Sequence, residues 1–124
     1  MRKGIYAAGG TAVDFGVIAP CDGIPDATEG MKYILPSREV ICDAIEVPTR
    51  TSMLAGLVLL GSCDKIVPGM LMAAARLEMP GSFLSGGPMY PTSDCGRHYD
   101  GNIVAGAIGW IQQGRIDEEE FRHI

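Results

Sequence analysis

Three short polar motifs hold the side chains of this 124-residue chain that could do chemistry. They are Cys-Asp-Gly at 21–23, Cys-Asp-Lys at 63–65 and Ser-Gly-Gly at 85–87. The carboxylates of Asp22 and Asp64, with no histidine nearby, suit a hard divalent cation such as Mg²⁺ better than general acid–base catalysis. Aspartates in turns also commonly hydrogen-bond to the backbone, so the spacing alone leaves both interpretations open.

Cys63 has a different chemistry from the two aspartates. A thiolate beside Asp64 is electrostatically disfavoured unless a positive group lies next to it, which a soft metal ion or Lys65 could supply. The alternative is that Cys63 is a small buried residue, because free cysteine often packs as one. A metal ligand and a buried thiol are therefore the two interpretations of Cys63.

The other cysteines give weaker signals. Zinc and redox motifs separate their cysteines by about two to four residues, and no two of the four cysteines here are that close. Cys21 and Cys42 are interpreted as small buried residues, and Cys95 as a candidate free thiol. Because Asp14 interrupts the N-terminal segment before any signal-peptide core, we expect a cytoplasmic chain without a disulfide framework.

The composition excludes several classes of protein. Hydrophobic residues make up 47% of the chain and charged residues 20%, which is unlike an intrinsically disordered chain. The longest apolar run, 53–61, is far shorter than the roughly 18 residues of a membrane span. The net charge of −5 argues against a nucleic-acid partner. We therefore expect neither nucleic acid nor a membrane as a partner.

The apolar pattern predicts alternating strands and helices. Strands are predicted at 11–20, 57–60 and 82–84, and helices from Ser37 to Pro48, from Pro68 to Met79, at 102–113 and from Asp117 onwards. Ser37, Asp100 and Asp117 are candidate N-caps. The continuous apolar run at 57–60 is expected to be buried on both faces, and the stretch 90–99 to be irregular.

This order of elements predicts an α/β fold with parallel βαβ units. Each of the three polar motifs directly follows a predicted strand. Because ligands of open α/β sheets bind beyond the carboxyl ends of the strands, we expect the motifs to converge on one edge of the sheet. The alternative is that they are three ordinary surface turns.

Longer motifs, in order along the chain, resemble the dihydroxy-acid dehydratase and phosphogluconate dehydratase family. They are Cys-Asp-Gly-Ile at 21–24, Glu-Gly-Met-Lys-Tyr at 29–33, Leu-Pro-Ser-Arg-Glu at 35–39, Gly-Ser-Cys-Asp-Lys-Ile-Val-Pro-Gly-Met at 61–70 and Ser-Gly-Gly-Pro-Met at 85–89. The resemblance covers nearly the whole chain. It implies an α/β, parallel-sheet βαβ segment of the N-terminal domain of a dehydratase, with 1–124 as a single partial domain.

The resemblance implies a hydro-lyase that converts 2,3-dihydroxy acids to 2-keto acids, as in branched-chain amino acid biosynthesis, with an iron–sulfur cluster and Mg²⁺. Cys63 looks like one of three cysteines that hold a 2Fe–2S or 4Fe–4S cluster. Asp22 and Asp64 look like Mg²⁺ ligands. Lys65 looks like the family's carbamylated lysine, whose carbamate binds Mg²⁺. The alternatives are a segment of a sugar-acid dehydratase, acting on aldonate or phosphogluconate, and a non-catalytic fragment that keeps the fold.

The resemblance places other functional residues outside this chain. The family's first cluster cysteine would precede Met1, the third would follow Ile124, and the base serine would come much later. We therefore expect the isolated chain to be inactive and the full-length form to be a homo-oligomer that binds a small dihydroxy acid. Within the match, Ser52 and Ala55 stand where the family usually has histidine and aspartate.

Overall fold

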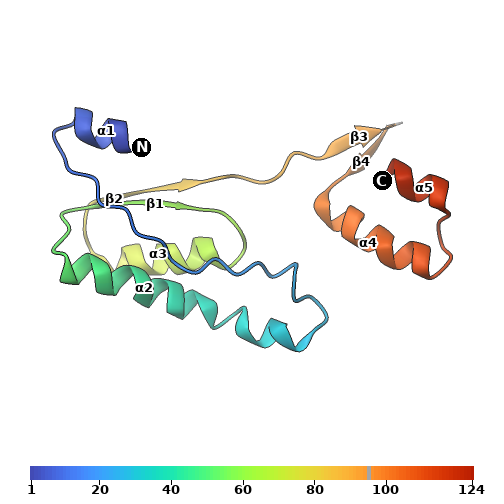
Figure 1. Cartoon of the computed structure of the whole chain (residues 1–124), viewed down its shortest axis with the longest axis horizontal. Helices are drawn as coiled ribbons and strands as arrows, with labels where there is room; N and C mark the ends of the chain where they lie inside the picture. Colours follow the sequence, from blue (N-terminus) through green and yellow to red (C-terminus); the bar gives the residue numbers. More distant parts are fainter. Residues whose placement is uncertain (95) are drawn as a thin grey trace. The chain divides into compact units, whose positions relative to one another are not determined.

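A parallel pair of strands joined by a helix lies at the centre of residues 1–86. Strand β1 (Leu57–Gly61) pairs in parallel along its whole length with β2 (Gly81–Ser85), and helix α3 (Ile66–Leu77) connects them (Figure 1). The carboxyl ends of both strands therefore finish at the same edge. This βαβ unit confirms the predicted parallel-sheet α/β fold.

This computed structural model describes residues 1–94 and 96–124, with the side chain of residue 94 left out of the description. The described residues form two compact units, 1–86 and 87–124. Cys95, the candidate free thiol, lies outside the described residues. No helix in the described part of the chain is both long enough and apolar enough to cross a membrane.

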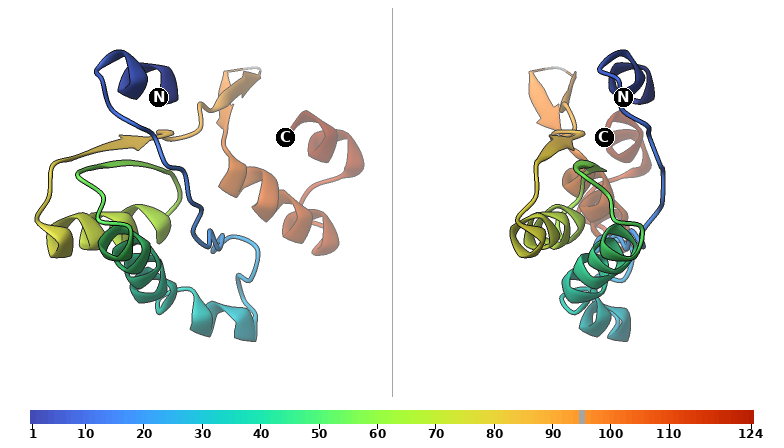
Figure 2. Two further views of the ribbon diagram at one scale, coloured as in Figure 1. Left: turned by 60° about the vertical axis from the view of Figure 1, so that its left-hand side comes forward. Right: turned by 90° about the vertical axis from the view of Figure 1, so that its left-hand side faces the viewer.

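Helices α2 (Ser37–Thr51) and α3 lie side by side on one side of the strand pair (Figure 1 and Figure 2). Apolar residues of α2 recur at a spacing of four, which puts them on the helix face that meets α3 and β1. The buried residues of this core are Ile41, Cys42, Ile45, Leu57, Leu59, Ile66, Met70 and Ala73. The prediction that Cys42 is a small buried residue is therefore confirmed.

Gly69 allows the two helices to approach closely. A Cβ atom at this position would lie 3.0 Å from the backbone oxygen of Arg38 and 3.0 Å from the Cβ of Ile41. These contacts are shorter than ordinary van der Waals distances between such atoms. A residue without a side chain is therefore needed where α3 crosses α2.

Strand β1 alternates between buried and exposed side chains although its sequence is apolar. Leu57 and Leu59 are buried in the core, whereas Val58 and Leu60 are 46% and 54% exposed. The prediction that this run is buried on both faces is therefore wrong for the described residues. Parallel sheets usually have helices on both faces, and α2 and α3 both lie on one side of this one.

The predicted strand at 11–20 is not formed. The segment between α1 (Arg2–Ala7) and the 3₁₀ helix η1 (Glu29–Tyr33) contains neither helix nor strand. A strand needs a partner for its backbone groups, and Pro20 has no N–H to offer one. The segment is nevertheless fixed to the core by Val17, which packs against it.

The predicted helix ends shift by a few residues. Ser37 is the first residue of α2 rather than its N-cap, and its hydroxyl donates to the backbone oxygen of Ile34. Pro48 lies inside α2, which continues to Thr51. Pro68 lies in the first turn of α3, two residues after Ile66 begins it, where a missing N–H costs little.

The second unit contains a hairpin and two helices. Strand β3 (Thr92–Asp94) pairs antiparallel with β4 (Arg97–Tyr99), so the prediction of an irregular segment here is wrong. These strands are only a few residues long and lack a clear apolar alternation.

The predicted caps of the two helices in this unit, α4 (Gly101–Gln112) and α5 (Glu118–His123), are confirmed. The carboxylates of the preceding aspartates, at 100 and 117, accept hydrogen bonds from backbone N–H groups in the first turn of each helix.

Candidate metal centre

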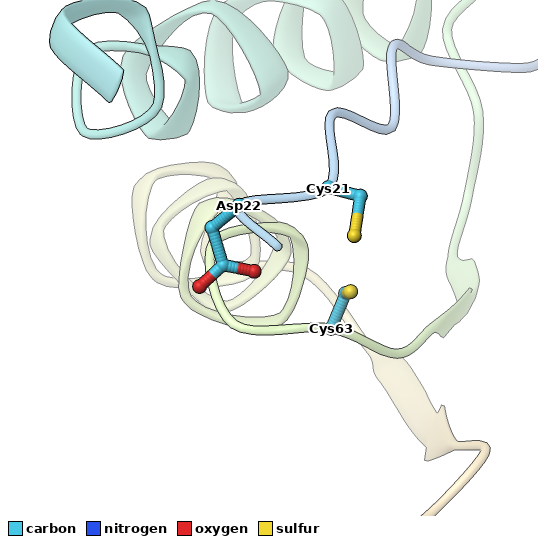
Figure 3. A group of neighbouring side chains, drawn as sticks. All are labelled: Cys21, Asp22 and Cys63. Atoms are coloured by element: carbon cyan, nitrogen blue, oxygen red, sulfur yellow. The ribbon is translucent and has the colours of Figure 1, made fainter. Parts of the chain in front are cut away.

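Two cysteines and an aspartate meet beyond the carboxyl end of β1. One ligand atom from each of Cys21, Asp22 and Cys63 lies within 4.8 Å of the others. Figure 3 shows the sulfurs of the two cysteines directed toward each other, with the carboxylate of Asp22 beside them. Forty-two positions separate the two cysteines in the sequence. The fold therefore assembles this group from two distant segments.

Each segment is positioned by the core. Cys63 lies in the short turn between β1 and α3, and its backbone has a φ of +82°, in the left-handed region. Cys21 and Asp22 lie in the irregular segment that Val17 fixes to the core. Cys63 is exposed, whereas Cys21 and Asp22 are half-buried. The group therefore combines one exposed residue with two half-buried ones.

Replacement of Cys63 by glycine and by alanine should reveal the strain in this turn. Both changes remove the sulfur, but only alanine keeps a Cβ, which disfavours positive φ by about 1–2 kcal/mol. Glycine loses more conformational entropy on folding than alanine, which offsets part of this difference. The glycine variant should therefore be the more stable by about 0.5–1 kcal/mol. Chemical denaturation of both variants measures this difference.

The control for this comparison is Ala75, an exposed residue within α3. There the preference should reverse, because glycine in a helix interior is less favourable than alanine by about 1 kcal/mol. A Cys63→Ala variant as stable as Cys63→Gly would show that the turn relaxes to an ordinary backbone conformation.

The surroundings of Cys63 disfavour its thiolate. The pKa of the Cys63 thiol is raised above its ordinary value, first by loss of hydration and then by Cys21 and the negative charge of Asp22. A bound cation would reverse this effect, because metal binding favours the deprotonated thiol. The negative charge around Cys63 therefore disfavours an unpaired thiolate but would attract a cation.

The predicted residues Asp64 and Lys65 form a pair of their own. The Nζ atom of Lys65 donates to Oδ2 of Asp64. Lys65 precedes α3 as its N-cap, and its side chain is 23% exposed. The group of potential ligand atoms found within 4.8 Å contains Asp22 and Cys63 but neither of these two residues. Asp22 therefore lies beside Cys63, whereas Asp64 is paired with Lys65.

The third predicted motif reaches the same edge. The backbone N–H of Gly86 donates to the carbonyl oxygen of Gly61, the last residue of β1. A Cβ atom at Gly86 would lie 3.3 Å from the Cβ of Ser62, next to Cys63 in sequence. The parallel pairing of β1 and β2 causes this proximity, as expected from the order of elements.

Cys21 belongs to the candidate site, although the sequence does not single it out. The sequence predicts a small buried residue at this position, but Cys21 is half-buried and its sulfur lies within 4.8 Å of that of Cys63. One signal was available, because the dipeptide Cys-Asp occurs twice, at 21–22 and 63–64, each time at the start of a polar motif. The same residue pair in both converging loops could have indicated a two-cysteine site.

The donor set combines soft and hard ligands. Two thiols suit iron or another thiophilic metal, and the carboxylate of Asp22 also suits a hard cation such as Mg²⁺. Asp64, which is paired with Lys65, adds a second carboxylate in the same loop as Cys63, and this one is exposed. These residues therefore fit both a thiolate-bound iron centre and an oxygen-bound divalent cation.

Comparison with known proteins identifies the family of this chain. Residues 1–124 match the family described as dihydroxy-acid/6-phosphogluconate dehydratase N-terminal. Dihydroxy-acid dehydratases of Pyrococcus abyssi and Halothermothrix orenii are 46% and 48% identical to this chain over 98% and 100% of it, and the chain spans 22% of each. That of Clostridium pasteurianum is 44% identical over 100% of the chain, which covers 43% of that relative. This chain therefore belongs to the dihydroxy-acid and 6-phosphogluconate dehydratase family and corresponds to its N-terminal segment.

Proposed function

We propose that this chain provides part of the active site of a hydro-lyase that removes water from a 2,3-dihydroxy acid and yields a 2-keto acid. The observation that supports this most directly is the meeting of an exposed cysteine and an aspartate beyond the carboxyl end of β1, because hydroxide is a poor leaving group that a Lewis-acidic metal bound by such ligands can stabilise. Family membership makes dehydration the expected chemistry.

Cys63 is the proposed ligand to an iron–sulfur cluster, of either the 2Fe–2S or the 4Fe–4S type. Cys63 is the most exposed residue among the described cysteines and lies outside the core, so a cluster could be inserted without opening the core. The turn that holds it is short and bounded by β1 and α3 on its two sides. Cys63 would therefore present its sulfur at a fixed place on the edge of the sheet.

Asp22, Asp64 and Lys65 are the proposed ligands to Mg²⁺. As an ammonium, Lys65 has no lone pair for a metal, and its contact with Asp64 occupies one of the two carboxylates. Reaction of the neutral amine with carbon dioxide would form an N–C bond and release a proton. The resulting carbamate would offer anionic oxygens and would end the ion pair, which leaves Asp64 available to the cation.

Bound at these residues, the two metal groups would supply Lewis acidity toward the oxygens of the substrate. The contribution of the chain itself is to hold donors of two kinds close together. The edge of the sheet positions Cys63 and Asp64, and Val17 anchors the segment that brings in Asp22. The proposed substrate is therefore a small acid with adjacent hydroxyl groups. By family membership, we also propose that the full-length protein is a cytoplasmic homo-oligomer.

Substitution of Asp22 by asparagine tests the proposed function. The change keeps the size of the side chain but removes its charge, so turnover of 2,3-dihydroxy acids should fall by about 10–100-fold or more, in line with the loss of charge beside a catalytic metal. The measurement is 2-keto acid formation by the complete gene product, assayed without oxygen and with Mg²⁺.

Asp26 gives the matched control in the same loop. It is exposed, and its carboxylate accepts the N–H of the next residue, Ala27. The Asp26→Asn variant should keep the activity of the unmodified protein. If the unmodified, metal-loaded protein forms no keto acid from branched-chain dihydroxy acids or from aldonic acids, the proposal is wrong and a non-catalytic role is supported. Turnover of aldonic acids alone would identify a sugar-acid dehydratase.

A further inference from the structure

We propose that Cys21 and Cys63 form a reversible disulfide when the metal-free protein meets hydrogen peroxide or an organic hydroperoxide. This inference uses only the thiol pair and does not depend on the proposed dehydratase activity. Both cysteines are free thiols, and their sulfurs face each other (Figure 3). The pair thus forms a candidate site of reversible oxidation at the edge of the sheet.

The geometry requires a small movement. The two sulfurs lie within 4.8 Å of each other, and a disulfide bond is about 2 Å long. The approach can come from Cys21, because no helix or strand includes residues 8–28 and none has to be broken. Gly23, two residues later, has only the Cys21 sulfur within 4 Å of the place a Cβ would occupy. A shift of Cys21 toward Cys63 therefore breaks no helix or strand.

The chemistry balances with the peroxide as the oxidant. Cys63, the more exposed of the two residues, reacts as its thiolate. Its sulfur attacks the peroxide O–O bond and becomes a sulfenic acid, and water or an alcohol is released. The Cys21 thiol then attacks the sulfenic sulfur, so the S–S bond forms and a second water leaves. Two thiols lose two electrons and two protons in total, and one peroxide is reduced. An added dithiol reverses the reaction.

The functional consequence follows from the position of Cys63. A sulfur in a disulfide cannot bind a metal ion as a thiolate. Oxidation would therefore block the metal centre while protecting Cys63 from further oxidation to the sulfinic acid, which is not readily reversed. Cys42 is fully buried in the core and offers no such reaction.

Peptide mapping of the complete gene product tests this proposal. The protein is stripped of metal with a chelator, reduced, exposed to hydrogen peroxide, alkylated without reduction, digested and analysed by mass spectrometry. A peptide pair that links Cys21 to Cys63, and that a dithiol separates, is the expected result. A Cys95→Ser background removes the fourth cysteine of residues 1–124 as a competing partner, and Cys42 should be alkylated only after denaturation.

A sulfenic-acid trap such as dimedone gives the second measurement. In the Cys21→Ser variant the sulfenic acid at Cys63 has no partner, so trapping should be at least about 10-fold greater than in the unmodified protein, because the intramolecular thiol competes effectively. The proposal is overturned if no linked peptide forms, or if trapping at Cys63 is equal in both proteins. A Cys21→Ala variant distinguishes loss of the thiol from an effect of the serine hydroxyl.

Discussion

Replacement of Cys63 by serine should reduce the iron and sulfide content of the anaerobically prepared protein and should lower 2-keto acid formation by about 10²–10³-fold, because a lost Lewis acid is worth several kcal/mol of transition-state stabilisation. A serine hydroxyl is almost isosteric with the thiol but is a much poorer ligand for iron. Metal analysis, the visible absorption of the cluster and turnover should all decline together.

Cys42 provides the control for this result. It is completely buried in the core between α2 and α3, so it is inaccessible to a cluster. A Cys42→Ala variant should keep its iron and sulfide, although a small cavity will lower its stability. Normal iron content in Cys63→Ser would contradict the assignment of Cys63 as a ligand. Loss of iron in both variants would point instead to a general loss of folded protein, which circular dichroism detects.

Replacement of Ile41 by alanine should lower the free energy of unfolding by about 2–5 kcal/mol. Ile41 has an exposed fraction of 0%, and it packs where Gly69 brings α3 against α2. The change removes methyl and methylene groups from a close-packed contact and leaves a cavity that the two helices cannot readily close. Because the total free energy of unfolding of a domain is about 5–15 kcal/mol, such a loss is a large fraction of its stability.

Val40 is the matched control for Ile41, since it is the preceding residue of the same helix and is 51% exposed. Val40→Ala should change the unfolding free energy by no more than about 0.5 kcal/mol. Denaturant midpoints of both variants, measured in the complete gene product, give the comparison. Equal midpoints would mean that the helix pair contributes little to the unfolding transition that the experiment follows.

Local signals in the sequence predicted the elements that depend on local contacts. The caps at Asp100 and Asp117 were found because a side chain three residues or fewer from its donor is sufficient to form them. The parallel pairing followed from two apolar segments separated by a helical one. The family was indicated by ordered motifs around Cys63, and the comparisons confirmed it.

The failures involve features that depend on distant partners. The segment 11–20 has the composition of a strand, but no neighbouring strand in the structure pairs with it. Exposure of Val58 could not be deduced either, because an apolar run does not reveal which layers cover it. The location of Cys21 beside Cys63 depends on how a segment without regular structure crosses the core, and periodicity contains no information on such a path.

The one-sided packing of β1 has a practical consequence for handling these residues. Val58, Leu60 and Leu84 are each 46–54% exposed, and all three are large aliphatic side chains on adjacent parallel strands. If residues 1–86 were excised and expressed by themselves, this water-facing aliphatic surface would favour self-association and chaperone capture. Polar substitutions at these three positions would then be a rational route to a soluble fragment, since they leave Leu57 and Leu59 in place.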